Sequence, residues 1–346
     1  MIHLWVRAEQ RAHEKRVGIT PEGAMALINA GMKVSVEESS QRIIPIADYA
    51  DVGCDIKAEN SWPAAPADAI IFGLKELPDD GTPLWHRHIM FGHAFKGQPS
   101  GRILLDRFVA GNGTLFDLEY LVDEAARRVA AFGYWAGYAG AAVALKCWVA
   151  QKNGGTAGAV HDYTNAEELV AELALELGQG DRPSALIIGA LGRVGTGAAD
   201  LCARLDVMTT KWDLAETASG GPFPEIMNHE ILLNCILARP GTPTFVPVSA
   251  KQSERKLSVI GDIACVPHSD FSPIKVYDRV TDWEAPALRV ADAPVLDVTA
   301  IDNLPSMLPL ESSQDFAAQL LPSLLGLSDI SSGVWTRASA TFAEHA

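Results

Sequence analysis

Short apolar runs separated by helix-forming stretches mark the first third of the chain. The runs have the length and residue types of β-strands, and they lie at 2–6, 33–37, 69–73 and 89–91. After the first run, Thr20-Pro21-Glu22 supplies a helix N-cap, a proline that fits the first helical position and an acid at the positive helix end, and Gly31 ends the helix. This order of strand, helix and strand predicts an α/β fold for the first part of the chain.

The second part repeats this rhythm with strands that are apolar on both faces. We expect strands at 185–189, 207–213, 231–236 and 257–262, and helices at 128–150, 166–177 and 192–205. Strands without a polar face are typical of a parallel sheet that helices cover on both sides. The uncharged stretch from Val129 to Leu145 contains Gly133, Gly137 and Gly140 and is marginal in length for a membrane span, so we interpret it as a closely packed buried helix.

A glycine-rich turn joins the strand expected at 185–189 to the helix expected at 192–205. Residues 188–197 read Ile-Gly-Ala-Leu-Gly-Arg-Val-Gly-Thr-Gly. Glycines at such a turn allow a tight bend and a close approach of the backbone to a pyrophosphate, and the helix N-terminus offers N–H groups and partial positive charge to the phosphates. We therefore predict a dinucleotide site whose residues are Gly189, Gly192, Arg193, Val194 and Gly195.

An acidic residue stands where NAD-selective proteins bind the adenosine ribose. Asp213 ends the next expected strand, about 20 residues beyond the turn, where a carboxylate accepts a hydrogen bond from the ribose 2′-hydroxyl. Its charge would repel the extra phosphate of NADP, although Lys211 would soften that repulsion. The glycine spacing departs by one residue from the usual fingerprint, but the order of strand, turn, helix, strand and acid predicts NAD as the cofactor.

The composition narrows the classes of partner. The 346 residues carry 28 basic and 43 acidic side chains, giving a net charge of −15 without a basic run, whereas nucleic-acid binders present a basic face. Hydrophobic residues make up 48%, enough for the cores of two domains. The five cysteines are scattered without zinc-ligand spacing, and the first residues do not resemble a secretory leader. We expect a cytoplasmic enzyme with no metal site and with neither nucleic-acid nor membrane partners.

Four charged or titratable residues before the nucleotide fold are candidates for the chemistry. A dehydrogenase needs side chains that move protons beside the hydride. Lys75 follows the apolar run at 69–73, His93 follows the run at 89–91, and Arg16 and Arg128 add two cations. Each residue alone also fits a structural role, because a lysine at a strand end is usually solvated and a histidine beside aromatic residues is usually packed.

Several blocks of sequence resemble one family. Arg-Val-Gly-Ile-Thr-Pro at 16–21 resembles the N-terminal signature of the alanine dehydrogenase, transhydrogenase and saccharopine dehydrogenase superfamily. Longer blocks are similar to those of the NAD-dependent, lysine-forming saccharopine dehydrogenases, and they lie at 73–76, 113–121, 127–134, 186–193, 211–213, 220–223 and 301–309. The resemblance runs nearly from end to end of the chain.

The resemblance implies a fold and a domain organisation. Family members join two Rossmann-like domains with parallel sheets and a cleft between them, and the last chain segment returns to the first domain. We therefore expect a substrate and catalytic domain of residues 1–133 plus about 310–346, and an NAD-binding domain of residues 134–309.

The resemblance also implies a reaction, in which saccharopine is oxidised with NAD and water to L-lysine and 2-oxoglutarate. Lys75 and His93 match the lysine and histidine that perform the acid–base steps in the family. Glu76 and Glu119 match acidic neighbours that tune this pair, and we place both with the substrate site. The small-molecule partners implied are therefore saccharopine, L-lysine and 2-oxoglutarate.

The remaining matches concern substrate carboxylates and the cofactor. Arg16 and Arg128 match arginines that bind the carboxylates of saccharopine, a role that suits the two-pronged guanidinium. Asp302 matches the acid that follows the last domain crossing, and we place it with the cofactor. Two departures are that Arg11 stands where many relatives have lysine and Val194 where some have cysteine.

Two other functions stay open at this point. An alanine dehydrogenase or another opine-type dehydrogenase would share Lys75 and His93, but the blocks around Arg128 and at 220–223 argue against it. A non-catalytic NAD(H)-binding module, like a transhydrogenase subunit that docks on a membrane partner, would not need both Lys75 and His93. The stretch 240–255 matches the family poorly and has no expected role.

Overall fold

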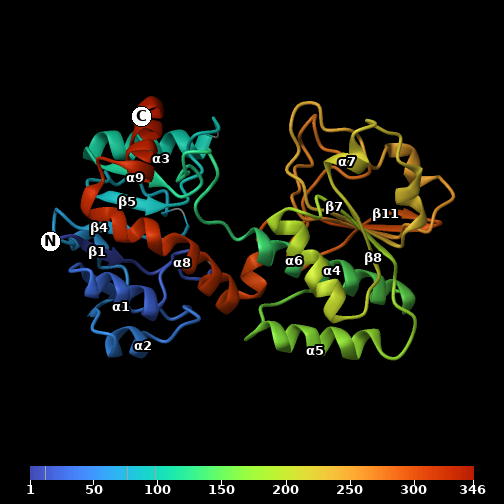
Figure 1. The fold of residues 1–346 in the computed structure, drawn as a ribbon, viewed down its shortest axis with the longest axis horizontal. Helices are drawn as coiled ribbons and strands as arrows, with labels where there is room; N and C mark the ends of the chain where they lie inside the picture. The colour runs from blue at the N-terminus through green and yellow to red at the C-terminus, as the bar shows by residue number, and fades with distance from the viewer. Residues whose placement is uncertain (12, 76, 98) are drawn as a thin grey trace. The chain divides into compact units, whose positions relative to one another are not determined.

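The chain forms two compact α/β units in a computed structural model that describes residues 1–11, 13–75, 77–97 and 99–346. Unit 1 comprises Met1–Ala131 and Pro309–Ala346, and unit 2 comprises Phe132–Leu308. These ranges differ from the expected domain ranges by at most two residues. Figure 1 shows the first strands, in blue, and the last helices, in red, within the same unit.

Unit 1 is built on a parallel sheet. Its six described strands lie side by side in the order β3-β2-β1-β4-β5-β6, and every neighbouring pair is parallel. The strands are β1 (His3–Val6), β2 (Lys33–Glu37), β3 (Asp55–Lys57), β4 (Ile70–Phe72), β5 (Arg87–Met90) and β6 (Thr114–Asp117). Because all strands run in one direction, the residues that follow them lie along one edge of the sheet, where α/β folds bind ligands.

Helices cover this sheet, and the C-terminal helices belong to it. The helices of unit 1 are α1 (Pro21–Asn29), α2 (Ile46–Asp51), α3 (Pro99–Gly111), α8 (Pro309–Leu325) and α9 (Gly333–His345). The expected cap of α1 is confirmed, because the Thr20 hydroxyl accepts the Gly23 N–H at 3.2 Å. Gly31 follows the helix with a φ of +86°, a conformation that favours glycine. Helix α8 packs on α1, and α9 packs on β6.

Unit 2 is built on a second six-stranded sheet, in the order β11-β12-β10-β9-β7-β8. Its strands are β7 (Ala185–Ile188), β8 (Thr209–Trp212), β9 (Ile231–Asn234), β10 (Val259–Asp262), β11 (Leu288–Asp292) and β12 (Val295–Thr299). All pairs are parallel except β11 with β12, an antiparallel pair outside the strands expected from the sequence. The two mostly parallel sheets confirm the expected α/β fold.

The helices of unit 2 correct one expected boundary. They are α4 (Gly133–Lys152), α5 (Ala166–Leu177), α6 (Arg193–Arg204) and α7 (Leu214–Thr217), and the stretch 240–255 contributes a single 3₁₀ turn, η3 (Val248–Lys251). The helix expected from residue 128 begins only at Gly133. Arg128 instead forms an antiparallel bridge with Val122, and the Asp123 carboxylate accepts the backbone N–H of Arg127 at 2.9 Å, so a turn occupies these residues.

Helices α4 and α6 cross at glycines. A Cβ atom on Gly137 would lie 1.8 Å from the Val194 carbonyl oxygen, and one on Gly197 would lie 1.9 Å from the Tyr134 carbonyl oxygen. Only glycine therefore allows the two backbones to approach this closely. Within the described residues, none of the helices has the length and apolar run needed to cross a bilayer. The glycine-rich stretch is thus a packed helix, as the sequence predicted.

A buried histidine lies in the core of unit 1. His88 on β5 is 1% exposed, and its ring packs edge-on against Trp62 and Phe108 with centroids 5.1 and 5.3 Å away. Within the described part of the chain, its Nε2 atom has no hydrogen-bond partner. Burial lowers the pKa of His88 well below its ordinary value of 6.5, and the charges of Arg7 and Arg107, together with the neighbouring His86, add to this effect. His88 is therefore neutral in the folded protein.

This burial makes the stability of unit 1 depend on pH. Below about pH 6.5 the unfolded chain takes up a proton at His88 that the folded chain does not, so the free energy of unfolding falls as the pH falls. The loss from this group between pH 6.5 and 5 is at most about 2 kcal/mol. We expect His88→Leu to flatten the decline in urea-unfolding free energy between pH 7 and 5. His161→Leu, which alters a 58% exposed side chain, should keep the wild-type slope. An unchanged slope in His88→Leu would contradict this interpretation.

Candidate active site and cofactor site

The candidate acid–base residues of unit 1 follow neighbouring strands. Lys75 comes after β4 and His93 after β5, and these strands pair in parallel with Phe72 opposite Ile89. The Phe91 N–H donates to the Leu74 carbonyl oxygen at 2.9 Å. The segments that lead to Lys75 and His93 therefore leave the sheet side by side at its carboxyl edge.

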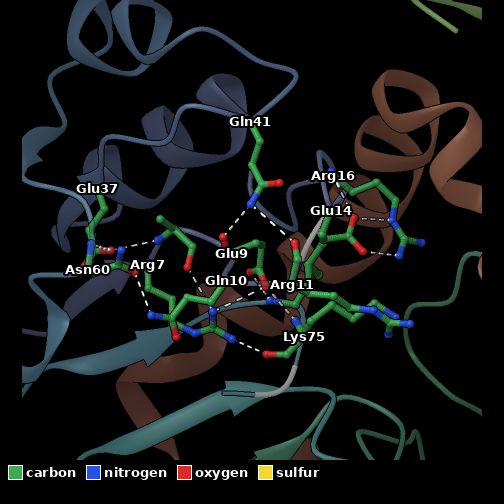
Figure 2. Close-up of polar contacts among 12 residues, drawn as sticks. Arg7, Glu9, Gln10, Arg11, Glu14, Arg16, Glu37, Gln41, Asn60 and Lys75 are labelled. Atoms are coloured by element: carbon green, nitrogen blue, oxygen red, sulfur yellow. Dashed lines mark hydrogen bonds and ion pairs between the residues drawn. The ribbon is translucent and has the colours of Figure 1, made fainter. Parts of the chain in front are cut away.

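The backbone of Lys75 is held by two charged residues that follow β1. Figure 2 shows Arg7 and Glu9 reaching toward Lys75. The Glu9 carboxylate accepts the N–H groups of Leu74 and Lys75 at 2.6 and 2.9 Å, while the Arg7 guanidinium donates to the Lys75 carbonyl oxygen. A Cβ atom on Gly73 would lie 2.4 Å from Arg7 Nε, so glycine makes room for this arginine. Both sides of the Lys75 peptide are therefore fixed.

Arg16 lies near Lys75 but is buried and paired with an acid that the sequence did not single out. Its Nε and Nη2 atoms donate to the two carboxylate oxygens of Glu14 at 2.8 and 2.6 Å (Figure 2). Burial alone would raise the pKa of Glu14, but the hydrogen bonds and charge of Arg16, together with the charge of Lys75, hold it below its ordinary value. Glu14 thus shares its charge with both cations.

His93 forms a second polar group with residues that follow β5 and β6. Its Nδ1 atom lies 3.8 Å from Glu119 Oε2, and Lys96 Nζ lies 2.8 Å from Glu119 Oε1. His93 and Lys96, with a further contribution from Arg128, lower the pKa of Glu119 to about 2. Arg128 itself is exposed. The structure therefore brings His93, Glu119 and Arg128 into one neighbourhood of unit 1.

Asp117 positions this second group. It ends β6, is fully buried, and accepts the N–H of Gly92 at 3.2 Å and the N–H of Glu119 at 2.8 Å. Burial raises its pKa to about 6. Asp117 therefore ties the loop that carries His93 to the loop that carries Glu119. His93 also has a φ of +49°, an uncommon conformation for a residue with a side chain, and such conformations cluster at functional sites.

Most of the missed residues share a signal that was visible in the sequence. Arg7, Glu9, Lys96 and Asp117 all lie at or within a few residues of a strand end, where side chains meet at the sheet edge. Each of them also contacts a residue at least 23 positions away, and the sequence gives no sign of which one. Glu76, the other acid expected beside Lys75, lies outside the described residues.

The glycine-rich turn of unit 2 joins β7 to α6. Gly189 follows β7 with a φ of +83°, and the N–H groups of Gly189 and Ala190 both donate to the Trp212 carbonyl oxygen, at 2.9 and 3.0 Å. A Cβ atom on Gly195 would lie 2.2 Å from the Gly189 carbonyl oxygen. Gly189 and Gly195 therefore shape the turn itself, whereas Gly197 allows α6 to pack closely on α4.

The start of α6 fits the pyrophosphate of a dinucleotide. Gly192 is its N-cap and supplies no side-chain cap, so the first N–H groups of the helix face the space in front of it. A Cβ atom on Gly192 would meet only the Gly189 carbonyl oxygen, at 3.4 Å, so the space above the turn is open. Arg193 is exposed on the first turn and Val194 is half-buried against Gly133.

The two acids assigned to the cofactor follow different strands of the sheet. Asp213 directly follows β8, and its Oδ2 atom accepts the Leu191 N–H of the glycine turn at 3.0 Å. Asp302 is exposed beyond β12, near Cys265, whose pKa it helps to raise. Strands β10 and β9 lie between β12 and β7, so Asp302 and the glycine turn follow strands that are not neighbours.

Comparisons with known proteins cover the whole chain. Residues 5–139 match the family model described as the alanine dehydrogenase/PNT N-terminal domain. The chain is 43% identical to the saccharopine dehydrogenase (NAD+, L-lysine-forming) of Candida albicans, over 99% of this chain and 96% of that protein. It is 42% identical to the protein of the same name from Schizosaccharomyces pombe, over 98% and 97%. A solved L-alanine dehydrogenase superposes with a TM-score of 0.68 at 17% identity, over 99% of this chain and 94% of that one, which bears on the fold alone.

Proposed function

The chain belongs to the NAD-dependent, L-lysine-forming saccharopine dehydrogenases, and we propose that it cleaves saccharopine oxidatively to L-lysine and 2-oxoglutarate. The full-length similarity carries this proposal, and it makes NAD the cofactor. Unit 1 is then the substrate and catalytic domain, and unit 2, with its glycine turn, is the NAD-binding domain. The reaction is reversible, so reductive condensation of lysine with 2-oxoglutarate is the same chemistry run backwards.

The reaction needs two kinds of proton transfer. Saccharopine is a secondary amine, which must lose a proton before hydride leaves the adjacent carbon, and bound NAD+ accepts that hydride. The resulting imine then takes up water and splits into an amine and a ketone. Lys75 and His93 are the groups at the edge of unit 1 that can accept and return these protons.

The surrounding charges support these roles. Glu9 and Arg7 hold the Lys75 backbone in place, and Glu14 supplies a negative charge near its ammonium group. Glu119, whose pKa is lowered to about 2, places a negative charge 3.8 Å from His93 Nδ1. Each of the two acid–base residues thus has an acidic side chain as a neighbour.

Two arginines supply positive charge for a substrate with three carboxylates. Arg128 is exposed beside Glu119 and can present its guanidinium to a substrate carboxylate. The guanidinium of Arg16 already pairs with Glu14, so Arg16 would contact a substrate carboxylate while keeping that ion pair. An enzyme with a net charge of −15 needs such local cations to hold a polyanion. We also propose a cytoplasmic location, since all five cysteines are free thiols, as in a reducing compartment.

One assay tests the proposed function. NADH oxidation is followed with three substrate pairs: lysine with 2-oxoglutarate, alanine with 2-oxoglutarate, and ammonia with pyruvate. We expect turnover with the lysine pair and little with the others. Faster turnover with ammonia and pyruvate would make the protein an alanine dehydrogenase. NADH binding without turnover of any pair would instead favour a non-catalytic NAD(H)-binding module.

A further inference from the structure

We propose that Glu216 is a second determinant of cofactor selectivity, which acts with Asp213 to exclude the 2′-phosphate of NADP. This inference deepens the proposed function, because it rests on NAD binding at the glycine turn of unit 2. The sequence assigned selectivity to Asp213 alone. The structure adds a second carboxylate beside it, held in place by backbone hydrogen bonds.

The contacts around Asp213 fix the position of Glu216. The Glu216 carboxylate accepts the backbone N–H of Asp213 at 2.7 Å, and the Asp213 carboxylate accepts the N–H of Leu214 at 2.9 Å. Together they form a capping box at the start of the short helix α7 (Leu214–Thr217). The Thr217 hydroxyl donates to the Asp213 carbonyl oxygen at 2.9 Å and closes the turn further. These hydrogen bonds hold the Glu216 carboxylate beside the backbone of Asp213.

The same residues are joined to the phosphate turn. The Asp213 Oδ2 atom accepts the Leu191 N–H, and the carbonyl oxygen of Trp212 accepts two further N–H groups of the turn. The Asp213 carboxylate thus already serves two backbone donors before any ribose hydroxyl arrives. Glu216 is exposed, so its negative charge would lie on the solvent side of a ribose bound at Asp213.

The charge balance at this edge explains why a second acid matters. Lys211 is exposed on β8 and Arg193 is exposed at the start of α6. These two cations would attract the 2′-phosphate of NADP and would offset a single aspartate. Asp213 and Glu216 together balance them, so the strand end presents no net positive charge to a phosphate.

The chain allows a variant that changes charge without changing shape. Glu216→Gln keeps an oxygen that accepts the Asp213 N–H, because glutamine serves in capping boxes as glutamate does. A unit charge acting on a phosphate dianion about 6–8 Å away in water corresponds to about a three- to tenfold change in binding. Glu284→Gln is the matched control, since Glu284 is also exposed in unit 2 but precedes β11, at the opposite edge of the sheet from β8.

The test measures dissociation constants by fluorescence titration with NADH and NADPH, and by calorimetry with ADP and 2′,5′-ADP. We expect Glu216→Gln to bind NADPH and 2′,5′-ADP about three- to tenfold more tightly than wild type, with NADH and ADP changed less than about twofold. The gain should shrink at 0.5 M KCl, because salt screens a charge effect but not a lost contact. The double variant Asp213→Asn/Glu216→Gln should favour NADPH more than either single change.

Because these titrations contain no substrate, they are independent of whether saccharopine is cleaved. Unchanged NADPH and 2′,5′-ADP affinities in Glu216→Gln at low salt would overturn the proposal and leave Glu216 as a helix cap. Equal gains in Glu284→Gln would also overturn it, since the effect would then come from total charge. A wild type that binds NADPH more tightly than NADH would reject both acids as selectivity determinants.

Discussion

Lys75→Met and His93→Gln are each expected to lower turnover with lysine and 2-oxoglutarate by about 10²–10⁴-fold, the usual cost of losing a positioned proton-transfer group. NADH binding should stay within about twofold, because both residues belong to unit 1 and the glycine turn belongs to unit 2. Steady-state kinetics and NADH titration of each variant separate the two effects. Methionine and glutamine preserve the approximate size of the side chains while removing their acid–base function.

A lysine on the same sheet provides the control. Lys57 ends β3 and pairs with Asp55 at 2.9 Å, so Lys57→Met removes a strand-end lysine that has no proposed proton-transfer role. Its turnover should remain close to that of the wild type. Near-normal turnover in both Lys75→Met and His93→Gln would show that neither residue transfers protons in the reaction. Loss of NADH binding in either variant would point instead to a disturbed fold.

Arg128→Ala is expected to weaken the interaction with 2-oxoglutarate or saccharopine by roughly 10–150-fold. A charge-assisted hydrogen bond to a carboxylate contributes about 1.5–3 kcal/mol, and about 1.4 kcal/mol corresponds to a tenfold change. The loss should appear mainly in the KM for the carboxylate substrate, with NADH affinity almost unchanged. Arg128→Lys should recover only part, since a point charge does not reproduce the guanidinium fork.

The neighbouring arginine makes the comparison specific. Arg127 is 78% exposed and pairs with Asp123, so Arg127→Ala removes an equal charge from the next position in the chain. Its KM for 2-oxoglutarate should stay within about twofold of the wild-type value. Equal effects of the two alanine variants would reduce the role of Arg128 to general electrostatic attraction. Arg16 is a poorer test, because its removal would take the paired guanidinium away from the buried Glu14 carboxylate.

Local patterns in the sequence determined much of the fold. The Thr20 cap, the glycine turn after β7 and helix α5 at 166–177 were all predictable, because capping, turn chemistry and hydrophobic periodicity involve residues close together in the chain. Eight of the twelve described strands were recognisable as apolar runs for the same reason: β1, β2, β4, β5, β7, β8, β9 and β10. Resemblance to the family added the domain ranges and the candidate acid–base pair, which periodicity does not reveal.

Where local patterns compete with tertiary contacts, the prediction was wrong or incomplete. The apolar stretch after Arg128 suggested a helix from that residue, but a bridge to Val122 delays the helix to Gly133. Four strands were missed. In unit 1 these are β3, which has three half-buried residues, and the four-residue strand β6. In unit 2 they are β11 and β12, because half-exposed positions along β11 weaken the apolar signal and the antiparallel pair interrupts the expected order.

The sequence by itself determined which residues stand at strand ends, and the tertiary structure decided which of them meet. Glu9 reaches the Lys75 backbone across 66 positions of the chain, and Asp117 reaches Gly92 across 25. Such contacts depend on the order of strands in the sheet, in which β4 lies beside β1 and β5 although 63 residues separate Val6 from Ile70 along the chain. Hydrogen bonds and ion pairs act over a few ångströms, so only the folded sheet shows that the charge of Lys75 acts on Glu14, and that the Asp213 carboxylate accepts the N–H of Leu191 in the glycine turn.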